Sequence, residues 1–182
     1  DGGLVKSCKE LKVVEETNKF YQYKLAAGIL KSVKKSEYYD DEIFLDLFEK
    51  GESQIDDEIQ KGMSDISKDV FLKTDFERIS YIRQSNARQI IEGLKSLNIR
   101  TLIPIPEGCT PLFIPVWLKE RNSVRRQMFQ EHIFCPVHWP LDGMDIKTGA
   151  EMAEHEMSII IDQRYTNTEM TRILETLEKA IK

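Results

Sequence analysis

The stretch MSIIIDQRYTNTEMTRILETL, residues 157–177, contains the signals that decide the fold. It opens with the apolar run Met157–Ile161, which is bounded by polar residues and predicts a buried β-strand. Thr166 and Glu169 then have the Thr-x-x-Glu spacing of a capping box, so a helix should begin directly after Thr166. Apolar residues follow at the spacing of one helix face: Ile173, Leu174, Leu177 and Ile181. The stretch therefore predicts a strand joined by a short polar turn to an amphipathic helix.

The preceding residues predict further strands and helices. Three apolar segments bounded by turn residues each predict a strand: Thr101–Pro104, Leu112–Leu118 and Ile133–Val137. A short helix should run from Asn122 or Ser123 to about His132. One helical turn is predicted over Ala150–His155, after a loop within residues 141–150. Strands and helices in this order predict an α+β fold, in which a small antiparallel sheet and helices form a sandwich.

The N-terminal half favours helices throughout. Proline, which breaks helix interiors, is absent from residues 1–103. One helix is predicted from Ser7 or Glu15 to Val33, and another over about Asp75–Leu97. Between them, apolar residues recur every three, four or seven positions: Phe44, Phe48, Ile55, Ile59, Met63 and Ile66. This spacing predicts a further helical segment.

Two regions follow from this contrast. Residues 1–98 should form a mostly helical connecting region that begins with the remnant of a strand at Gly3–Val5. Residues 99–182 should form a small α+β domain, on which the helical region packs. No signal peptide is visible at the N-terminus. The chain opens abruptly with Asp1-Gly2-Gly3 and without Met, so we expect it to be a piece of a longer protein.

Composition excludes several functional classes. The chain has 182 residues, of which 41% are hydrophobic and 31% charged, and this excludes a disordered tail. No apolar run approaches the about 20 residues that cross a bilayer, so no membrane association is expected. A net charge of −5 argues against nucleic-acid binding as the main function. The three cysteines form no C-x-x-C pair, which favours a reducing compartment, and we expect a cytoplasmic protein.

One short run contains three residues that can ligate a metal. His132, Cys135 and His138 are spaced by three, and both residue types bind zinc. Pro136 lies within the run and argues against a helix that would place all three on one face. In a strand, His132 and His138 point to the face opposite Cys135, and a fourth ligand is missing. We therefore predict no metal site, and we expect Cys135 to be a buried, unreactive side chain.

Two pairs of residues are candidates for a binding site. His138 and Trp139 follow a predicted strand, where an imidazole beside a large aromatic ring suits the mouth of a pocket. The alternative is a partly buried histidine beside a tryptophan that covers the core. Arg164 and Tyr165 follow the next strand, and Arg164 could bind a carboxylate or phosphate. The alternative is a structural ion pair between Arg164 and Asp162.

The order of these segments resembles a known family. The segment FCPVHWP, Phe134–Pro140, followed by residues 157–177, resembles the C-terminal part of fold-type-I aminotransferases, in particular the DegT/DnrJ-type sugar aminotransferases. Asp1–Val5 resembles the glycine pair and strand that follow the cofactor lysine in that family. Arg83–Leu97 resembles the long helix that leads into the small domain. No single motif is diagnostic; the order and spacing carry the resemblance.

The resemblance implies pyridoxal 5'-phosphate (PLP) chemistry. A lysine forms a Schiff base with PLP, and an amino group passes from a donor, usually glutamate, to a keto acceptor such as a keto sugar. The large domain that holds the lysine would precede Asp1, so no catalytic residue is assigned here and the chain alone should be inactive. His138 and Trp139 would lie at the cleft mouth and contact a small-molecule substrate, with Arg164 and Tyr165 as weaker candidates.

The resemblance also bears on substrate and partners. The position of the substrate-carboxylate arginine in aspartate-aminotransferase-like relatives falls near Glu156 and Ser158, where no arginine stands, and this favours a sugar or another non-standard acceptor. Family members are usually dimers, so a homodimer formed through or with the large domain is expected. The competing hypothesis is a non-catalytic interaction or regulatory domain that retains the small-domain fold.

The helix face that carries Phe44, Phe48 and Ile55 would meet the large domain or a second subunit in the intact protein. Without that cover, the chain should expose an apolar patch and self-associate. Sedimentation velocity over a concentration series tests this prediction. A single monomeric boundary at the highest concentration contradicts it.

Overall fold

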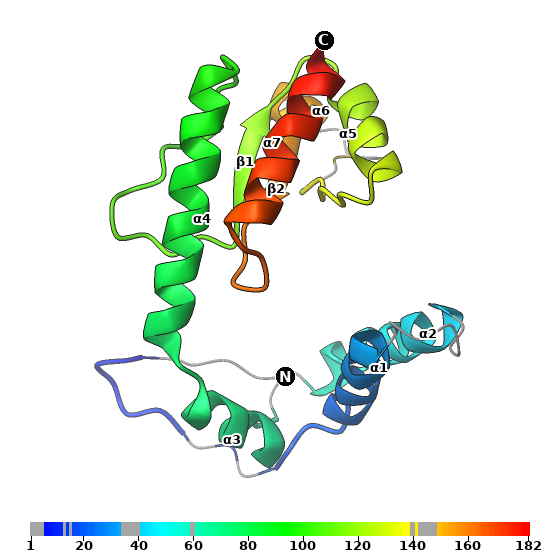
Figure 1. Ribbon diagram of the computed structural model, residues 1–182. Helices are drawn as coiled ribbons and strands as arrows, with labels where there is room; N and C mark the ends of the chain where they lie inside the picture. Colours follow the sequence, from blue (N-terminus) through cyan, green and yellow to red (C-terminus); the bar gives the residue numbers. More distant parts are fainter. Residues whose placement is uncertain are drawn as a thin grey trace. The chain divides into compact units, whose positions relative to one another are not determined.

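The computed structural model describes residues 6–12, 14, 16–33, 41–58, 61–138, 141 and 149–182. The chain forms two compact units, Asp1–Thr74 and Asp75–Lys182 (Figure 1). This division differs from the one expected after residue 98, because the long helix at the start of the second unit packs against that unit's last helix. The predicted strand remnant Gly3–Val5 lies outside the described residues.

The first unit is helical. Its elements are α1 (Tyr21–Val33), α2 (Asp41–Ser53), a 3-10 turn η1 (Asp56–Glu58) and α3 (Asp65–Lys73). Helices α1 and α2 pack against each other, as Figure 1 shows in blue and cyan. Part of the predicted aromatic face lies in this contact, since Lys24 Nζ lies 5.8 Å from the ring centre of Phe48, and Phe44 meets Phe48 edge to face.

Asn18 determines where α1 begins. Its side-chain oxygen accepts a hydrogen bond from the Tyr21 N–H (3.0 Å), which caps the helix. Its side-chain nitrogen donates to the carbonyl oxygen of Gly62 (2.8 Å), so the cap also binds the distant loop before α3. Asn18 is buried as a result. The helix therefore starts later than the predicted Ser7 or Glu15.

The second unit begins with α4 (Phe76–Ser96), and the predicted helix is confirmed there. Asp75 caps it by accepting a hydrogen bond from the Arg78 N–H (2.9 Å). The buried face of α4 carries four residues at helical spacing: Asn86, Ala87, Ile90 and Leu94. This face packs against α7 (Asn167–Ile181), whose capping box at Thr166 and Glu169 is also confirmed.

Strands β1 (Phe113–Trp117) and β2 (Glu156–Ile160) pair antiparallel, with Pro115 opposite Ser158. Side chains alternate between the two faces of this ladder. One face contributes to the core with Ile114, Val116, Met157 and Ile159. The other carries Phe113, Pro115, Trp117, Glu156, Ser158 and Ile160. The predicted small antiparallel sheet and α+β fold class are therefore confirmed.

Two predicted strands are corrected. Thr101–Pro104 makes only an isolated bridge from Thr101 to Val116, because the prolines that follow cannot donate to a ladder. Ile133–Val137 is not a strand, although it runs beside β2, where the Ser158 N–H donates to the Pro136 carbonyl oxygen (2.9 Å). Pro136 itself has no N–H to continue the pairing.

Two shorter helices complete the second unit. Helix α5 (Arg121–Gln130) begins slightly earlier than the predicted Asn122 or Ser123, and α6 (Ala150–His155) confirms the predicted turn. Helix α5 packs against α7 and β2, so the core lies between the sheet and helices α4, α5 and α7. Among the described residues, no helix is long and apolar enough to cross a membrane.

Helices α4 and α7 approach closely at Gly93. A Cβ atom added there would lie under 3.0 Å from three side-chain carbons of Leu174. Gly93 therefore lets the two helices pack at this separation, although glycine weakens a helix interior by about 1 kcal/mol relative to alanine.

Gly93→Ala should lower the free energy of unfolding by up to about 2 kcal/mol, because an overpacking cost of about 1–3 kcal/mol at Leu174 is partly offset by a gain of about 1 kcal/mol in helix propensity. In a Leu174→Ala background the same change should instead stabilise the chain by up to about 1 kcal/mol, through helix propensity. Urea unfolding of the four proteins of this double-mutant cycle measures the difference. Equal effects of Gly93→Ala in both backgrounds contradict the packing argument.

Candidate functional site

The polar face of β2 forms one half of the candidate site. Glu156 and Ser158 lie on the same face of the strand, and both are buried. The Ser158 hydroxyl donates to Glu156 Oε1 (2.6 Å), and the backbone N–H of His138 donates to Glu156 Oε2 (2.7 Å). The bond from the His138 N–H attaches the segment after Pro136 to the strand and places His138 beside it, whereas the Ser158 bond lies within β2.

The His138 ring is held from two sides. Its Nδ1 lies 2.9 Å from Ser158 Oγ and 3.7 Å from Glu156 Oε1. Its plane stacks on Phe113 of β1, with ring centres 4.4 Å apart and 22° between the planes. The side chain is 29% exposed, so this ring connects a buried carboxylate to the protein surface.

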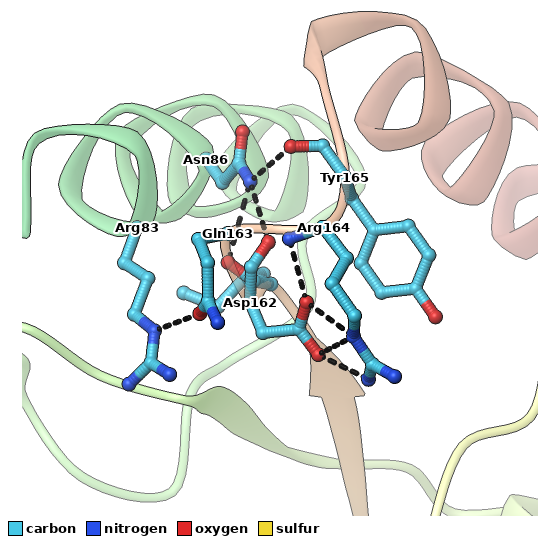
Figure 2. Close-up of polar contacts among 7 residues, drawn as sticks. Arg83, Asn86, Asp162, Gln163, Arg164 and Tyr165 are labelled. Atoms are coloured by element: carbon cyan, nitrogen blue, oxygen red, sulfur yellow. Dashed lines mark hydrogen bonds and ion pairs between the residues drawn. The ribbon is translucent and has the colours of Figure 1, made fainter. Parts of the chain in front are cut away.

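The second half of the candidate site is the turn between β2 and α7 (Figure 2). Asp162 is 3% exposed and accepts hydrogen bonds from both the backbone N–H and the guanidinium of Arg164. The Arg164 side chain is 65% exposed, and its guanidinium carbon lies 5.7 Å from the ring centre of Tyr165. The structure therefore shows the ion pair that was the alternative to ligand binding.

Helix α4 stabilises this turn through side-chain hydrogen bonds. The buried side-chain nitrogen of Asn86 lies within 3.1–3.3 Å of the carbonyl oxygens of Ile161, Asp162 and Tyr165. Arg83, one turn earlier on α4, donates to the side-chain oxygen of Gln163 (2.8 Å). Figure 2 shows these bonds joining the green helix to the turn. Asn86 thereby fixes the backbone on which Arg164 and Tyr165 stand.

The pairing of Asp162 with Arg164 shifts the pKa values of both side chains. Burial raises the pKa of Asp162, but the hydrogen bonds and charge of Arg164, with a smaller effect of Arg83, bring it below its ordinary value. The hydrogen bond to Asp162 in turn raises the pKa of Arg164, although burial opposes this. The pair is therefore ionised at neutral pH.

The four residues predicted for the site fall into different groups. His138 belongs to the group around Glu156 and Ser158, whereas Arg164 and Tyr165 belong to the turn after β2. Trp139 lies outside the described residues. Substrate contact by any of these residues stays a prediction.

The side chains of His132, Cys135 and His138 lie in three different environments. Cys135 is buried, as expected, and burial raises the pKa of its thiol to about 12, although Arg125 lowers it in part. His132 lies exposed in the turn after α5, while the Nδ1 of His138 faces Ser158. Within the described part of the chain, no three His, Cys, Asp or Glu side chains are grouped as metal ligands.

Sequence reasoning did not identify Glu156, Ser158 and Phe113 as partners of His138. A signal existed, because an acid and a serine at alternate positions of an apolar strand share one face. Their pairing with His138 depends on the proline-containing segment lying beside β2, and local sequence patterns do not encode this contact.

Comparisons with known proteins give a fold relationship. No protein-family model matches the sequence, and no curated protein matches it. Among solved structures, the chain is similar to an aminotransferase, TlmJ, from Streptoalloteichus hindustanus, with a TM-score of 0.50 and 17% identity over 57% of this chain and 32% of that one. It is also similar, with a TM-score of 0.48 and 15% identity, to a protein from Streptococcus pneumoniae assigned as a sugar aminotransferase, solved in its PMP form; the match covers 57% of this chain and 31% of that one.

The similarity to TlmJ concerns the fold of part of the chain. The match to TlmJ shows that this part has the fold of a portion of an aminotransferase, which confirms the resemblance at the level of fold. The chain spans about a third of the length of the structures that it matches.

Asp162→Asn should lower the free energy of unfolding at neutral pH by about 1–2 kcal/mol, because it removes charge-assisted hydrogen bonds between a buried carboxylate and a largely exposed arginine. The folded pKa of Asp162 is depressed, so its stabilisation is present above the unfolded value of about 3.9 and is lost as pH falls through the folded value. The difference between wild type and variant should therefore disappear in acid. Urea unfolding at several pH values measures it.

Asp69→Asn is the matched control, since Asp69 forms an exposed ion pair with Lys73 on α3. Its effect should stay within about 0.5 kcal/mol at every pH. A pH-independent loss in Asp162→Asn would mean that packing, and not the charge of Asp162, stabilises the turn.

Proposed function

We propose that this chain is the C-terminal part of a PLP-dependent aminotransferase that passes an amino group to a keto acceptor, with a keto sugar as the first candidate. The fold similarity to TlmJ is the observation that carries the proposal. The order of the segments around Phe134–Pro140 and residues 157–177, which resembles DegT/DnrJ-type enzymes, supports it independently.

The described residues do not by themselves fit PLP. A PLP site needs a Schiff-base lysine and a carboxylate for the pyridine nitrogen. The two buried carboxylates of the second unit are already engaged, Asp162 by Arg164 and Glu156 by Ser158 and the His138 N–H. In the first unit, Lys24 pairs with Glu52. The proposal therefore assigns the cofactor-binding groups to another part of a longer protein, and it assigns no chemical step to this chain.

The role proposed for this chain is to line one side of the substrate cleft. His138 is the best-supported residue, because a half-buried imidazole held by three neighbours has a defined orientation at the surface. Trp139 is its sequence neighbour and part of the same proposal. Arg164 is a weaker candidate, since Asp162 already neutralises its charge. A homodimeric, cytoplasmic enzyme is the proposed setting.

The test starts with the full-length gene product. Intact-mass and N-terminal analysis should show a protein longer than residues 1–182, and an absorbance scan should show the Schiff-base band of bound PLP. The band should disappear on borohydride reduction, and residues 1–182 alone should be colourless and unable to transfer an amino group from glutamate. A colourless product that natively begins at Asp1 would support the non-catalytic interaction domain instead.

In the active full-length protein, His138→Ala should reduce kcat/KM for the keto acceptor at least about tenfold, which corresponds to 1.4 kcal/mol of transition-state stabilisation. His132→Asn is the matched control, because His132 is exposed in a left-handed turn that asparagine tolerates. Equal, small effects of the two substitutions would mean that His138 does not contact the substrate.

A further inference from the structure

Helix α5 carries two arginines and a phenylalanine on one face. Arg121, Arg125 and Phe129 are four residues apart, so their side chains stand one above the other along the helix. The helix contains no acidic residue from Arg121 to Gln130. This face is therefore positively charged over its first two turns and apolar near its C-terminal end.

Two adjoining hollows lie along this face of α5. The first has a volume of about 320 Å³ and is lined by Phe129, by residues 133–136 and by Ile160 of β2. The second, of about 480 Å³, lies between α5 and α6 and is lined by Arg121. Because Arg125 lines both hollows, they form one continuous groove, called here the α5 groove.

The arginine charges in the α5 groove are not neutralised by carboxylates of the described residues. The Arg121 guanidinium donates to two backbone carbonyl oxygens, at 3.2 and 3.4 Å, and that of Arg125 donates to the Cys135 carbonyl oxygen (2.8 Å). Glu154 lines the groove as well, but within the described part of the chain it pairs with neither arginine. Since arginine is charged at every working pH, the groove has a surplus of positive charge.

The apolar end of the α5 groove has exposed aromatic rings at its edge. Phe129 and Phe134 meet edge to face with ring centres 5.0 Å apart, and they are 58% and 59% exposed. The buried Ile133 and Cys135 line the same hollow. Aromatic rings beside arginines are typical of protein interfaces, whereas a small-molecule site encloses most of its ligand. The groove therefore fits a segment of another protein better than a small ligand.

The spacing along α5 indicates which peptide fits. Residues four apart on a helix are separated by about 6 Å along its axis. In an extended peptide, side chains on one face recur about every 6.7 Å. Alternate residues of an extended peptide therefore match Arg121, Arg125 and Phe129 in turn.

We propose that the α5 groove docks an extended acidic peptide segment of a partner protein. Two of its carboxylates face Arg121 and Arg125, whose forked N–H donors match the geometry of a carboxylate. An apolar side chain of the peptide enters the hollow beside Phe129 and Phe134. This docking requires neither PLP nor His138, so it is independent of the proposed function.

Chemical-shift titration by NMR of residues 1–182 with synthetic peptides tests the proposal. The probe is the capped peptide Glu-Thr-Glu-Thr-Leu-Thr-Glu-Thr-Glu, which reads the same in both directions and so fits either orientation. In one control peptide every Glu is replaced by Gln, and in the other Leu is replaced by Ser. Each control should bind at least about fivefold more weakly than the probe, because it lacks the two ion pairs or the buried side chain. Equal dissociation constants for the probe and the Gln control, or no binding of the probe at millimolar concentration, overturn the proposal.

Substitutions in the chain locate the binding. Arg125→Gln and Phe134→Ala should each weaken binding of the probe about threefold or more. Arg126→Gln is the matched control, because Arg126 is the next residue of the same helix, is exposed, and lines neither hollow. Should Arg125→Gln fail to fold, Phe134→Ala and the control peptides decide. An equal loss in Arg126→Gln and Arg125→Gln would mean unspecific charge attraction and refute the site.

Two results would assign the α5 groove to another occupant and overturn the peptide. Phenylbutyrate, an anion with an apolar ring, would indicate a small-molecule site if it bound as tightly as the probe. Self-association of the wild-type chain that Phe134→Ala abolishes, without competition by the probe, would indicate a second copy of this chain. Sedimentation velocity with and without the probe distinguishes that case.

Discussion

The antiparallel pairing of β2 with β1 is the constraint on which the second unit depends. It places Met157 and Ile159 in the core and, by alternation, Glu156 and Ser158 on the opposite face. A shift of one residue in register would place Glu156 and Ser158 in the apolar core and move Met157 and Ile159 to the opposite face. The hydrophobic core and the polar group at His138 are therefore two results of one register, and neither can change without the other.

The turn after β2 connects the sheet to helices α4 and α7. Asn86 of α4 binds the carbonyl oxygens of Ile161, Asp162 and Tyr165, so one buried amide joins α4 to the segment between β2 and α7. The pair of Asp162 and Arg164 stabilises the same turn from its solvent side. Arg164 thus contributes to the positioning of α7, which explains its geometry without a ligand.

The elements with strong local signals were predictable from sequence. The capping box at Thr166, the apolar run of β2 and the apolar stripe of α4 each depend on neighbours within a few residues. Ile133–Val137 was predicted as a strand from its apolar content, but it makes no ladder with β2 beyond the bond from the Ser158 N–H to the Pro136 carbonyl oxygen. Pro136 cannot donate to such a ladder, although β1 forms one in spite of Pro115. The partners of His138 were not predictable, since they depend on how that segment lies beside β2.

The burial of Glu156 has a physical cost that its hydrogen-bond partners must offset. Placing a carboxylate in a protein interior costs several kcal/mol unless it is paired, and apolar replacements of buried ionic groups are often equally stable or more stable. Its described side-chain partners are a serine hydroxyl, a backbone N–H and an imidazole, and no arginine or lysine is among them. Glu156 has a structural role in the fold, because its bond to the His138 N–H attaches the segment after Pro136 to β2. The same bonds give His138 a defined orientation at the surface, which is what the proposed substrate contact requires.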